Sequence, residues 1–169
     1  MDSMTILNLS RLFNVSMEYI CGVADDDTPE NSVKSRFRVP VLGSVPAGVP
    51  IEAVEDIIDW EEISPDMLAG GREYFALRVK GDSMYPDYMQ GDVVIVRKAT
   101  TCETGDVCVV YVNGYEATLK QVRLDELYQS MTLVPRNPDY QPRTFSAEEI
   151  ASLPVSIAGV VVELRRKIK

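Results

Sequence analysis

The sequence predicts a mostly β domain preceded by a short α-helical segment. From Val39 onward, closely spaced runs of β-branched and apolar residues alternate with turn residues. The spacing is too short for helical crossovers between strands, which argues against an alternating α/β fold. Before residue 24, by contrast, apolar residues recur at helical spacing.

The N-terminal segment predicts two short helices. Apolar side chains follow helical spacing over residues 6–13, and a second helix is expected over residues 17–21, between a Ser16 cap and Gly22. Two helices of this size cannot bury a core by themselves. Residues 1–23 are therefore predicted to be a piece of a larger helical domain, and the polar, partly acidic residues 24–38 a linker.

Six strands are predicted in the β region. Asn113-Gly114 is the strongest short hairpin signal in the chain, so the runs on either side of it are predicted to pair. Ser64-Pro65-Asp66 predicts the start of one short helix. The predicted strands cover residues 75–79, 92–96, 107–112, 115–122, 131–134 and 157–164.

Composition narrows the classes of function. The chain has no histidine, which removes Ser-His-Asp and Cys-His mechanisms and histidine-dependent zinc sites. A net charge of -9 argues against a nucleic-acid-binding surface, which normally carries a basic excess. No apolar run is long enough to span a membrane and no signal peptide is recognisable, so a cytoplasmic protein without membrane contact is expected. Nothing in the sequence predicts a cofactor, a metal or a small-molecule ligand.

Two minor features have simple interpretations. Cys21, Cys102 and Cys108 lack metal-like spacing; the last two could meet across a turn, but ordinary reduced thiols are the simpler interpretation. The basic end, residues 165–169, is interpreted as a solubilising end, not as a nucleic-acid patch.

Ser83 is a candidate nucleophile. It lies in Gly81-Asp82-Ser83-Met84, just after a predicted strand. At such a junction the backbone amides of Asp82 and Ser83 could remain free to form an oxyanion hole. The local sequence taken alone favours the simpler interpretation, a plain turn.

Lys120 is the candidate general base, because a chain without histidine needs another base for nucleophilic chemistry. Strand alternation places it on one face with Thr118 and Val122. A lysine in a strand ordinarily faces solvent. Buried beside a serine, however, it would have a lowered pKa and could accept the serine proton.

Residues 39–51 are rich in proline and have two interpretations. The first is an irregular connector, and the second is an extended peptide that lies in a cleft. Within this segment, Ala47-Gly48 is the sterically slim peptide bond, since Gly48 has no Cβ to obstruct attack.

The order of these features resembles the LexA and lambda-type phage repressor family of self-cleaving proteins, whose domain is also found in UmuD-like mutagenesis proteins. The resemblance covers residues 39–169 and implies a LexA-like β-clip fold. The motifs that carry it are Leu42–Gly48, Gly81–Met84, Gly91–Val94, Thr118–Lys120, Leu133–Pro138 and Gly159–Val161.

The resemblance implies a serine endopeptidase with a Ser83–Lys120 dyad that cleaves its own chain between Ala47 and Gly48, with the Asp82 and Ser83 amides as the oxyanion hole. It also implies RecA filaments on single-stranded DNA as the trigger, homodimerisation through this domain, and no cofactor.

Val45 and Pro46 are the residues expected to be recognised ahead of the cleaved bond. Pro46 departs from the usual pattern, because proline has no amide hydrogen to pair with a strand of the cleft. Slower or differently gated cleavage is therefore expected.

Residues 1–23 are similar to the last two helices of a phage-repressor helix-turn-helix domain, whose recognition helix would lie upstream. The chain is thus expected to be the self-inactivating part of a transcriptional repressor of the phage or SOS type. Operator DNA binding is expected only of a longer parent with a complete helix-turn-helix.

Two alternatives remain open. The first is a catalytically silent dimerisation module in which Ser83 and Lys120 are inert. The second is a signal-peptidase-like Ser-Lys protease, because residues 83–86 match its Ser-Met-x-Pro pattern loosely. The lack of a membrane anchor and the Ala-Gly bond upstream argue against the second alternative.

Overall fold

The computed structural model describes residues 37–45, 48, 54–114 and 117–168. The chain divides into a small unit, residues 1–38 and 62–65, and a large unit, residues 39–61 and 66–169. In the small unit the amide of Ile63 donates a hydrogen bond to the carbonyl of Phe37. The expectations for residues 1–36, including the two helices, Cys21 and most of the linker, concern residues outside this description.

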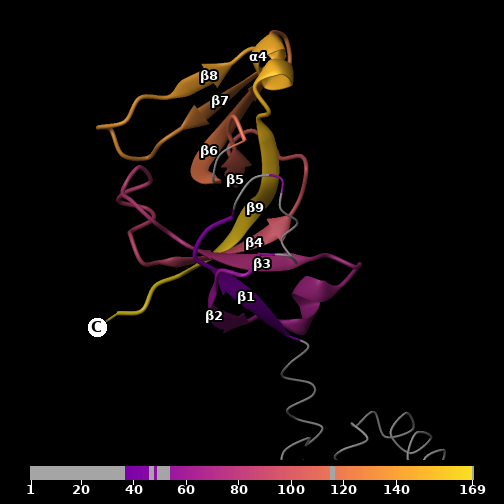
Figure 1. Cartoon of the computed structure of the whole chain (residues 1–169), viewed down its shortest axis with the longest axis vertical. Coiled ribbons are helices and arrows are strands. Elements are labelled where there is room, and N and C mark those ends of the chain that lie inside the picture. Colours follow the sequence, from indigo (N-terminus) through magenta and orange to yellow (C-terminus); the bar gives the residue numbers. More distant parts are fainter. Residues whose placement is uncertain (1–36, 46–47, 49–53, 115–116, 169) are drawn as a thin grey trace, which may run out of the picture. The chain divides into compact units, whose positions relative to one another are not determined.

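The large unit is mostly β, as predicted. Its described part contains nine strands in one sheet, in the order β2-β1-β3-β4-β9-β5-β6-β7-β8, and one short α-helix, α4 (Ala147–Ser152) (Figure 1). The strands are β1 (Arg38–Leu42), β2 (Ile57–Glu62), β3 (Tyr74–Arg78), β4 (Val93–Lys98), β5 (Val107–Tyr111), β6 (Thr118–Asp125), β7 (Ser130–Val134), β8 (Arg143–Phe145) and β9 (Ser156–Arg165).

The six predicted strands are confirmed as β3, β4, β5, β6, β7 and β9, with ends shifted by a few residues. β5 and β6 form the predicted antiparallel pair. Asn113 and Gly114 have φ angles of 56° and 71°. This is the left-handed conformation that a tight hairpin turn requires and that Asn-Gly adopts readily. The short helix expected at Ser64-Pro65-Asp66 is a 3₁₀ turn, η2 (Pro65–Leu68).

Three strands and one helix were not predicted. β1 falls in the proline-rich segment, where its residues Val41 and Leu42 pair with the parallel strand β3. β2 and β8 have mostly exposed side chains and therefore lack a hydrophobic pattern. The helix α4 has a capping box between Ser146 and Glu149, a Ser-x-x-Glu signal that the sequence does contain.

The sheet is strongly curled, and this curl creates the site. In a flat sheet, β3 and β6 would lie roughly 19 Å apart, because three strands separate them and neighbours are about 4.8 Å apart. Register shifts in the pairings of β9 with β4 and β5 mark bulges, which bend and twist strands. The segment after β1 then contacts the start of β6 through a hydrogen bond of 3.1 Å, which the amide of Ala117 donates to the carbonyl of Val45.

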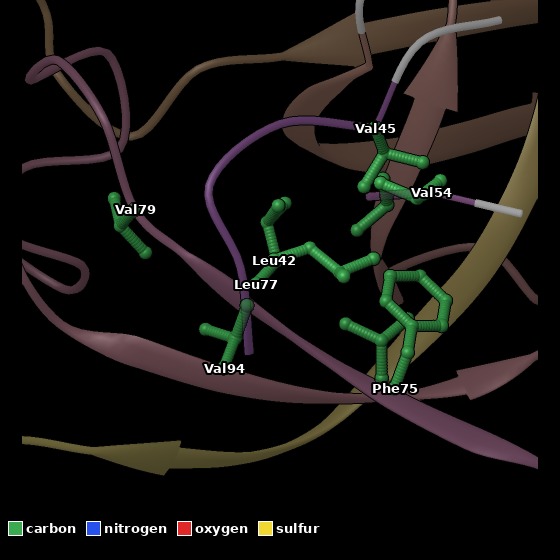
Figure 2. Close-up of a cluster of buried hydrophobic side chains, with 9 residues drawn as sticks. Leu42, Val45, Val54, Phe75, Leu77, Val79 and Val94 are labelled. Atoms are coloured by element: carbon green, nitrogen blue, oxygen red, sulfur yellow. The ribbon is translucent and has the colours of Figure 1, made fainter. Parts of the chain in front are cut away.

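An apolar cluster fills the inside of this curl. Figure 2 shows Val45 and Val54 side by side near Phe75, with Val79 at the other end of the cluster. Val79 leads directly into the turn that contains Ser83, and Val45 lies in the proline-rich segment, just beyond β1. The remaining members are Leu42, Leu77, Val94, Val96 and Val109. The cluster therefore anchors both parts of the candidate site to the same core.

Candidate active site

Ser83 lies in a tight turn between β3 and β4. Gly81 opens this turn with a φ angle of 74°, a conformation that favours glycine. The side chain of Met84 is buried, and the amide of Tyr85 donates to the carbonyl of Asp82 at 3.0 Å. The turn predicted from Gly-Asp-Ser is therefore real, and it presents a serine.

Lys120 reaches this serine from β6. Its Nζ lies 2.7 Å from the Ser83 Oγ, and it donates to the Thr118 Oγ1 at 3.0 Å and to the Leu119 carbonyl at 2.9 Å. The shared face of Thr118 and Lys120 follows the predicted alternation, whereas the contact between their side chains was not predicted. The two candidate residues, 37 positions apart in the sequence, are in direct contact.

The surroundings of this amine favour its neutral form. Burial lowers the pKa of Lys120, because desolvation disfavours the charged state. Among the described residues, none of its hydrogen-bond partners is a carboxylate that would oppose this effect. A neutral amine has two N–H groups and one lone pair. The hydrogens can go to Thr118 and Leu119, which leaves the lone pair for the Ser83 hydroxyl.

The backbone of the turn has free donors. Within the described part of the chain, no hydrogen-bond acceptor contacts the amide of Asp82 or that of Ser83. The corresponding carbonyls, in contrast, are occupied: the amides of Arg136 and Asn137 both donate to the carbonyl of Ser83. Asn137 lies in one of the motifs that carry the resemblance, but only the tertiary structure reveals its contact with this turn.

A small cleft of about 120 Å³ opens beside Ser83, between the end of β3 and the start of β6. Val45, Leu77 and Leu119 are among its lining residues. Val45, one of the two expected recognition residues, is buried, and its carbonyl accepts a hydrogen bond from the amide of Ala117, the residue just before β6.

Gly48 is not in this cleft. It is exposed and borders a separate hollow with Tyr111, Gly114, Pro154 and Ser156, none of which lines the cleft of Ser83. Pro46 and Ala47, the other residues expected at the cleavage site, fall among the residues that are not described. The segment is thus docked at Val45, while Gly48 lies in a different hollow from the serine.

The model of the Peptidase S24-like family matches residues 40–162, well over half of the chain. The chain belongs to this family. The match confirms the resemblance to LexA, UmuD-like proteins and phage repressors, and it makes the chain a member of a serine peptidase family. The S24-like match includes the turn of Ser83 and the strand of Lys120.

The basic end of the S24-like chain differs from expectation. Arg165 pairs with Glu61 at 2.7 Å, and Arg166 donates to both carboxylate oxygens of the buried Asp92, at 2.8 and 2.6 Å. The hydrogen bond from Arg166 lowers the pKa of Asp92. The interpretation as a solubilising end did not predict these partners. Arg166 has one because a buried carboxylate such as Asp92 requires a partner.

Three further observations concern the rest of the described chain. Cys102 and Cys108 are free thiols, and burial raises the pKa of both. No cluster of three or more potential metal-ligating side chains occurs in the part that the structure covers. None of the helices described there combines the length and the apolar character needed to cross a membrane.

Proposed function

We propose that this chain is a latent, self-cleaving serine peptidase in which Ser83 attacks the Ala47–Gly48 bond and Lys120 is the general base. The observation that carries the proposal is the 2.7 Å contact between the Ser83 Oγ and the Lys120 Nζ. An amine at this distance has the position that a base requires, and burial, by lowering its pKa, favours the neutral form that can accept a proton.

The first half of the reaction forms an acyl-enzyme. Neutral Lys120 takes the hydroxyl proton of Ser83 while the Oγ attacks the carbonyl carbon of Ala47. The carbonyl oxygen becomes an oxyanion, which accepts hydrogen bonds from the amides of Asp82 and Ser83. The C–N bond then breaks, the protonated Lys120 donates its proton to the nitrogen of Gly48, and an ester links Ala47 to Ser83.

The second half restores the serine. Lys120, neutral again, removes a proton from a water molecule, and the resulting hydroxide attacks the ester carbon. The Ser83 oxygen leaves and recovers its proton from Lys120. The products are two peptide fragments, one ending at Ala47 and the other beginning at Gly48.

Latency follows from the position of the segment. Val45 is already docked beside the cleft, which supports recognition of this residue and of Pro46 ahead of the bond. Gly48 lies in another hollow, so we propose that it must move before Ser83 can reach the bond. Such a rearrangement is a natural point of control, because a ligand that favours the docked position accelerates cleavage.

In the cell, we propose that this reaction inactivates a transcriptional repressor of the phage or SOS type. The RecA filament on single-stranded DNA is the proposed trigger, and the domain is proposed to act as a homodimer in the cytoplasm. Operator DNA is proposed as a partner only of a longer parent with a complete helix-turn-helix domain. The net charge of -9 agrees with a chain that does not itself carry the main DNA-binding surface.

Alkaline incubation tests the chemistry without any trigger. Raising the pH toward about 10 deprotonates Lys120 and should release two fragments whose masses define a break between Ala47 and Gly48. Ser83→Ala and Lys120→Ala should each abolish the break. Ser152→Ala, a serine substitution at the exposed end of α4, is the matched control and should cleave at the normal rate.

The alternatives give different results in the same experiment. A chain that stays intact at high pH and with activated RecA, yet sediments as a dimer, contradicts the proposal and favours a silent dimerisation module. Cleavage of an added preprotein, without cleavage of the chain itself, favours a signal-peptidase-like enzyme.

A further inference from the structure

The loop between β7 and β8 contacts the turn of Ser83 on its carbonyl side. The amides of Arg136 and Asn137 both donate to the carbonyl of Ser83, each at 3.1 Å. The side-chain Nδ2 of Asn137 donates to the carbonyl of Asp82, also at 3.1 Å. That carbonyl accepts a second hydrogen bond from Tyr85. Two successive peptide groups of the turn are therefore fixed through their oxygens.

Fixing a peptide oxygen also fixes the hydrogen on the other side of the same peptide. A trans peptide is planar, and its C=O and N–H point in opposite directions. The Asp82 carbonyl points toward Asn137, so the Ser83 N–H of the same peptide points away from the β7–β8 loop. This N–H is one of the two donors of the proposed oxyanion hole.

We propose that Asn137 is a positioning residue of the oxyanion hole. Its carboxamide fixes the plane of the Asp82–Ser83 peptide, so that the Ser83 amide is already oriented when the oxyanion develops. The inference rests on the proposed function, and it adds a residue that contacts neither the attacked bond nor the base. A donor oriented in advance needs no reorganisation during the reaction, which is the main source of oxyanion-hole catalysis.

The surroundings of Asn137 give its side chain one orientation. The residue is 7% exposed, and both ends of its carboxamide are in use. While Nδ2 donates to Asp82, Oδ1 accepts the amide of Asp139 at 3.0 Å. Exchanging the two ends would leave a carbonyl oxygen facing a carbonyl oxygen and an N–H facing an N–H. An ion pair of 3.1 Å between Arg136 and Asp87 fixes the same loop to the far side of the turn.

Two substitutions separate the donor from the rest of the side chain. Asn137→Asp keeps the shape and the oxygen that accepts from Asp139 but removes the Nδ2 donor, and Asn137→Ala removes both without adding a charge. Thr132→Val is the matched control. It removes a side-chain hydrogen bond of 2.9 Å to Thr144, which joins β7 to β8, the two strands that the loop of Asn137 connects.

The reactivity of Ser83 toward a fluorophosphonate measures the oxyanion hole without the cleavage segment. In this reaction the Ser83 Oγ–P bond forms, the P–F bond breaks, fluoride leaves, and the serine proton passes to Lys120. Both Asn137 variants should be labelled at least about tenfold more slowly than the unmodified chain, whereas Thr132→Val should be labelled at the normal rate. The midpoint of the pH dependence, which reports Lys120, should not move in the two variants that add no charge, Asn137→Ala and Thr132→Val. Self-cleavage at alkaline pH should slow in parallel, and urea unfolding identifies conditions in which each variant is folded.

Several results would overturn the inference. Labelling of Asn137→Ala within about twofold of the unmodified chain means that the donor is not needed, and any loss in Asn137→Asp is then due to its added charge. A shifted pH midpoint in Asn137→Ala means that Lys120 has been displaced. Variants that are unfolded under all assay conditions indicate a purely structural role. If the unmodified chain is neither labelled nor cleaved, the proposed function fails and the inference fails with it. If it is both labelled and cleaved but the Asn137 variants match it, only the inference fails.

Discussion

Replacing Thr118 with valine tests how the environment of Lys120 would set the pH dependence of the proposed self-cleavage. Valine keeps the β-branched shape suited to a strand and removes only the hydroxyl that lies 3.0 Å from the Lys120 Nζ. The amine retains its contacts with Ser83 and with the Leu119 carbonyl. The substitution therefore changes one hydrogen bond to a partly buried base.

The size of the effect depends on the charge of the amine. A hydrogen bond to a charged group contributes about 1.5–3 kcal/mol, and a neutral one about 0.5–1.5 kcal/mol. Losing the Thr118 hydroxyl therefore costs the ammonium form about 1 kcal/mol more than the neutral amine, and the pKa of Lys120 falls further. Since 1.36 kcal/mol corresponds to one pH unit, the midpoint of the pH–rate profile should move down by about half to one unit.

The assay is the rate of self-cleavage from pH 7 to 11, followed by mass spectrometry of the two fragments. The rate rises with pH as Lys120 loses its proton, so the Thr118→Val curve should rise at lower pH. The maximum rate at high pH should be reduced by less than about tenfold, because the amine keeps two of its three contacts, including the one with Ser83. Thr132→Val, which changes a half-buried threonine on β7 away from Lys120, should leave the profile unchanged. A folded Thr118→Val variant whose midpoint stays in place or moves up refutes this reasoning.

Three further predictions concern stability, each measured by urea unfolding. Gly159→Ala should destabilise the chain by about 1–3 kcal/mol, since a Cβ there would lie 2.5 Å from the backbone oxygen of Arg97, an atom that cannot rotate away. Stability should fall as the pH drops from about 4 toward 2, because the lowered pKa of Asp92 contributes stability only while this carboxylate is ionised beside Arg166; Asp92→Asn should flatten that fall. Phe145→Ala should cost about 3–5 kcal/mol, because this side chain is fully buried in a second apolar cluster, with Val122, Leu133 and Ile157 among its members, and a cost below about 1 kcal/mol would contradict the packing.

The elements that the sequence predicted are those whose patterns are local. Runs such as Val93–Val96 and Cys108–Val110 are buried and apolar, and the Asn113-Gly114 turn has its own conformational signature. β2 and β8 were missed because exposed strands do not alternate between apolar and polar residues. β1 was missed because it contains Pro40, a residue type that argues against a strand. Its parallel pairing with the distant strand β3 leaves no local signal either.

The candidate site was only half predictable for a similar reason. Strand alternation placed Thr118 beside Lys120, and the glycine before Asp82-Ser83 predicted a turn. Nothing local, however, distinguishes a buried strand lysine from an exposed one. The contact of Asn137 with the serine turn joins residues 55 positions apart, so no periodic pattern in the sequence could reveal it.

By itself, the sequence determined the β character of the chain, the absence of histidine, and the set of motifs that indicated its family. Only the tertiary structure decided that Ser83 and Lys120 meet. The physical reason is that their contact depends on the curl of a sheet in which three strands separate β3 from β6. The same curl desolvates the amine and thereby lowers its pKa, so an ordinary strand lysine becomes a candidate base.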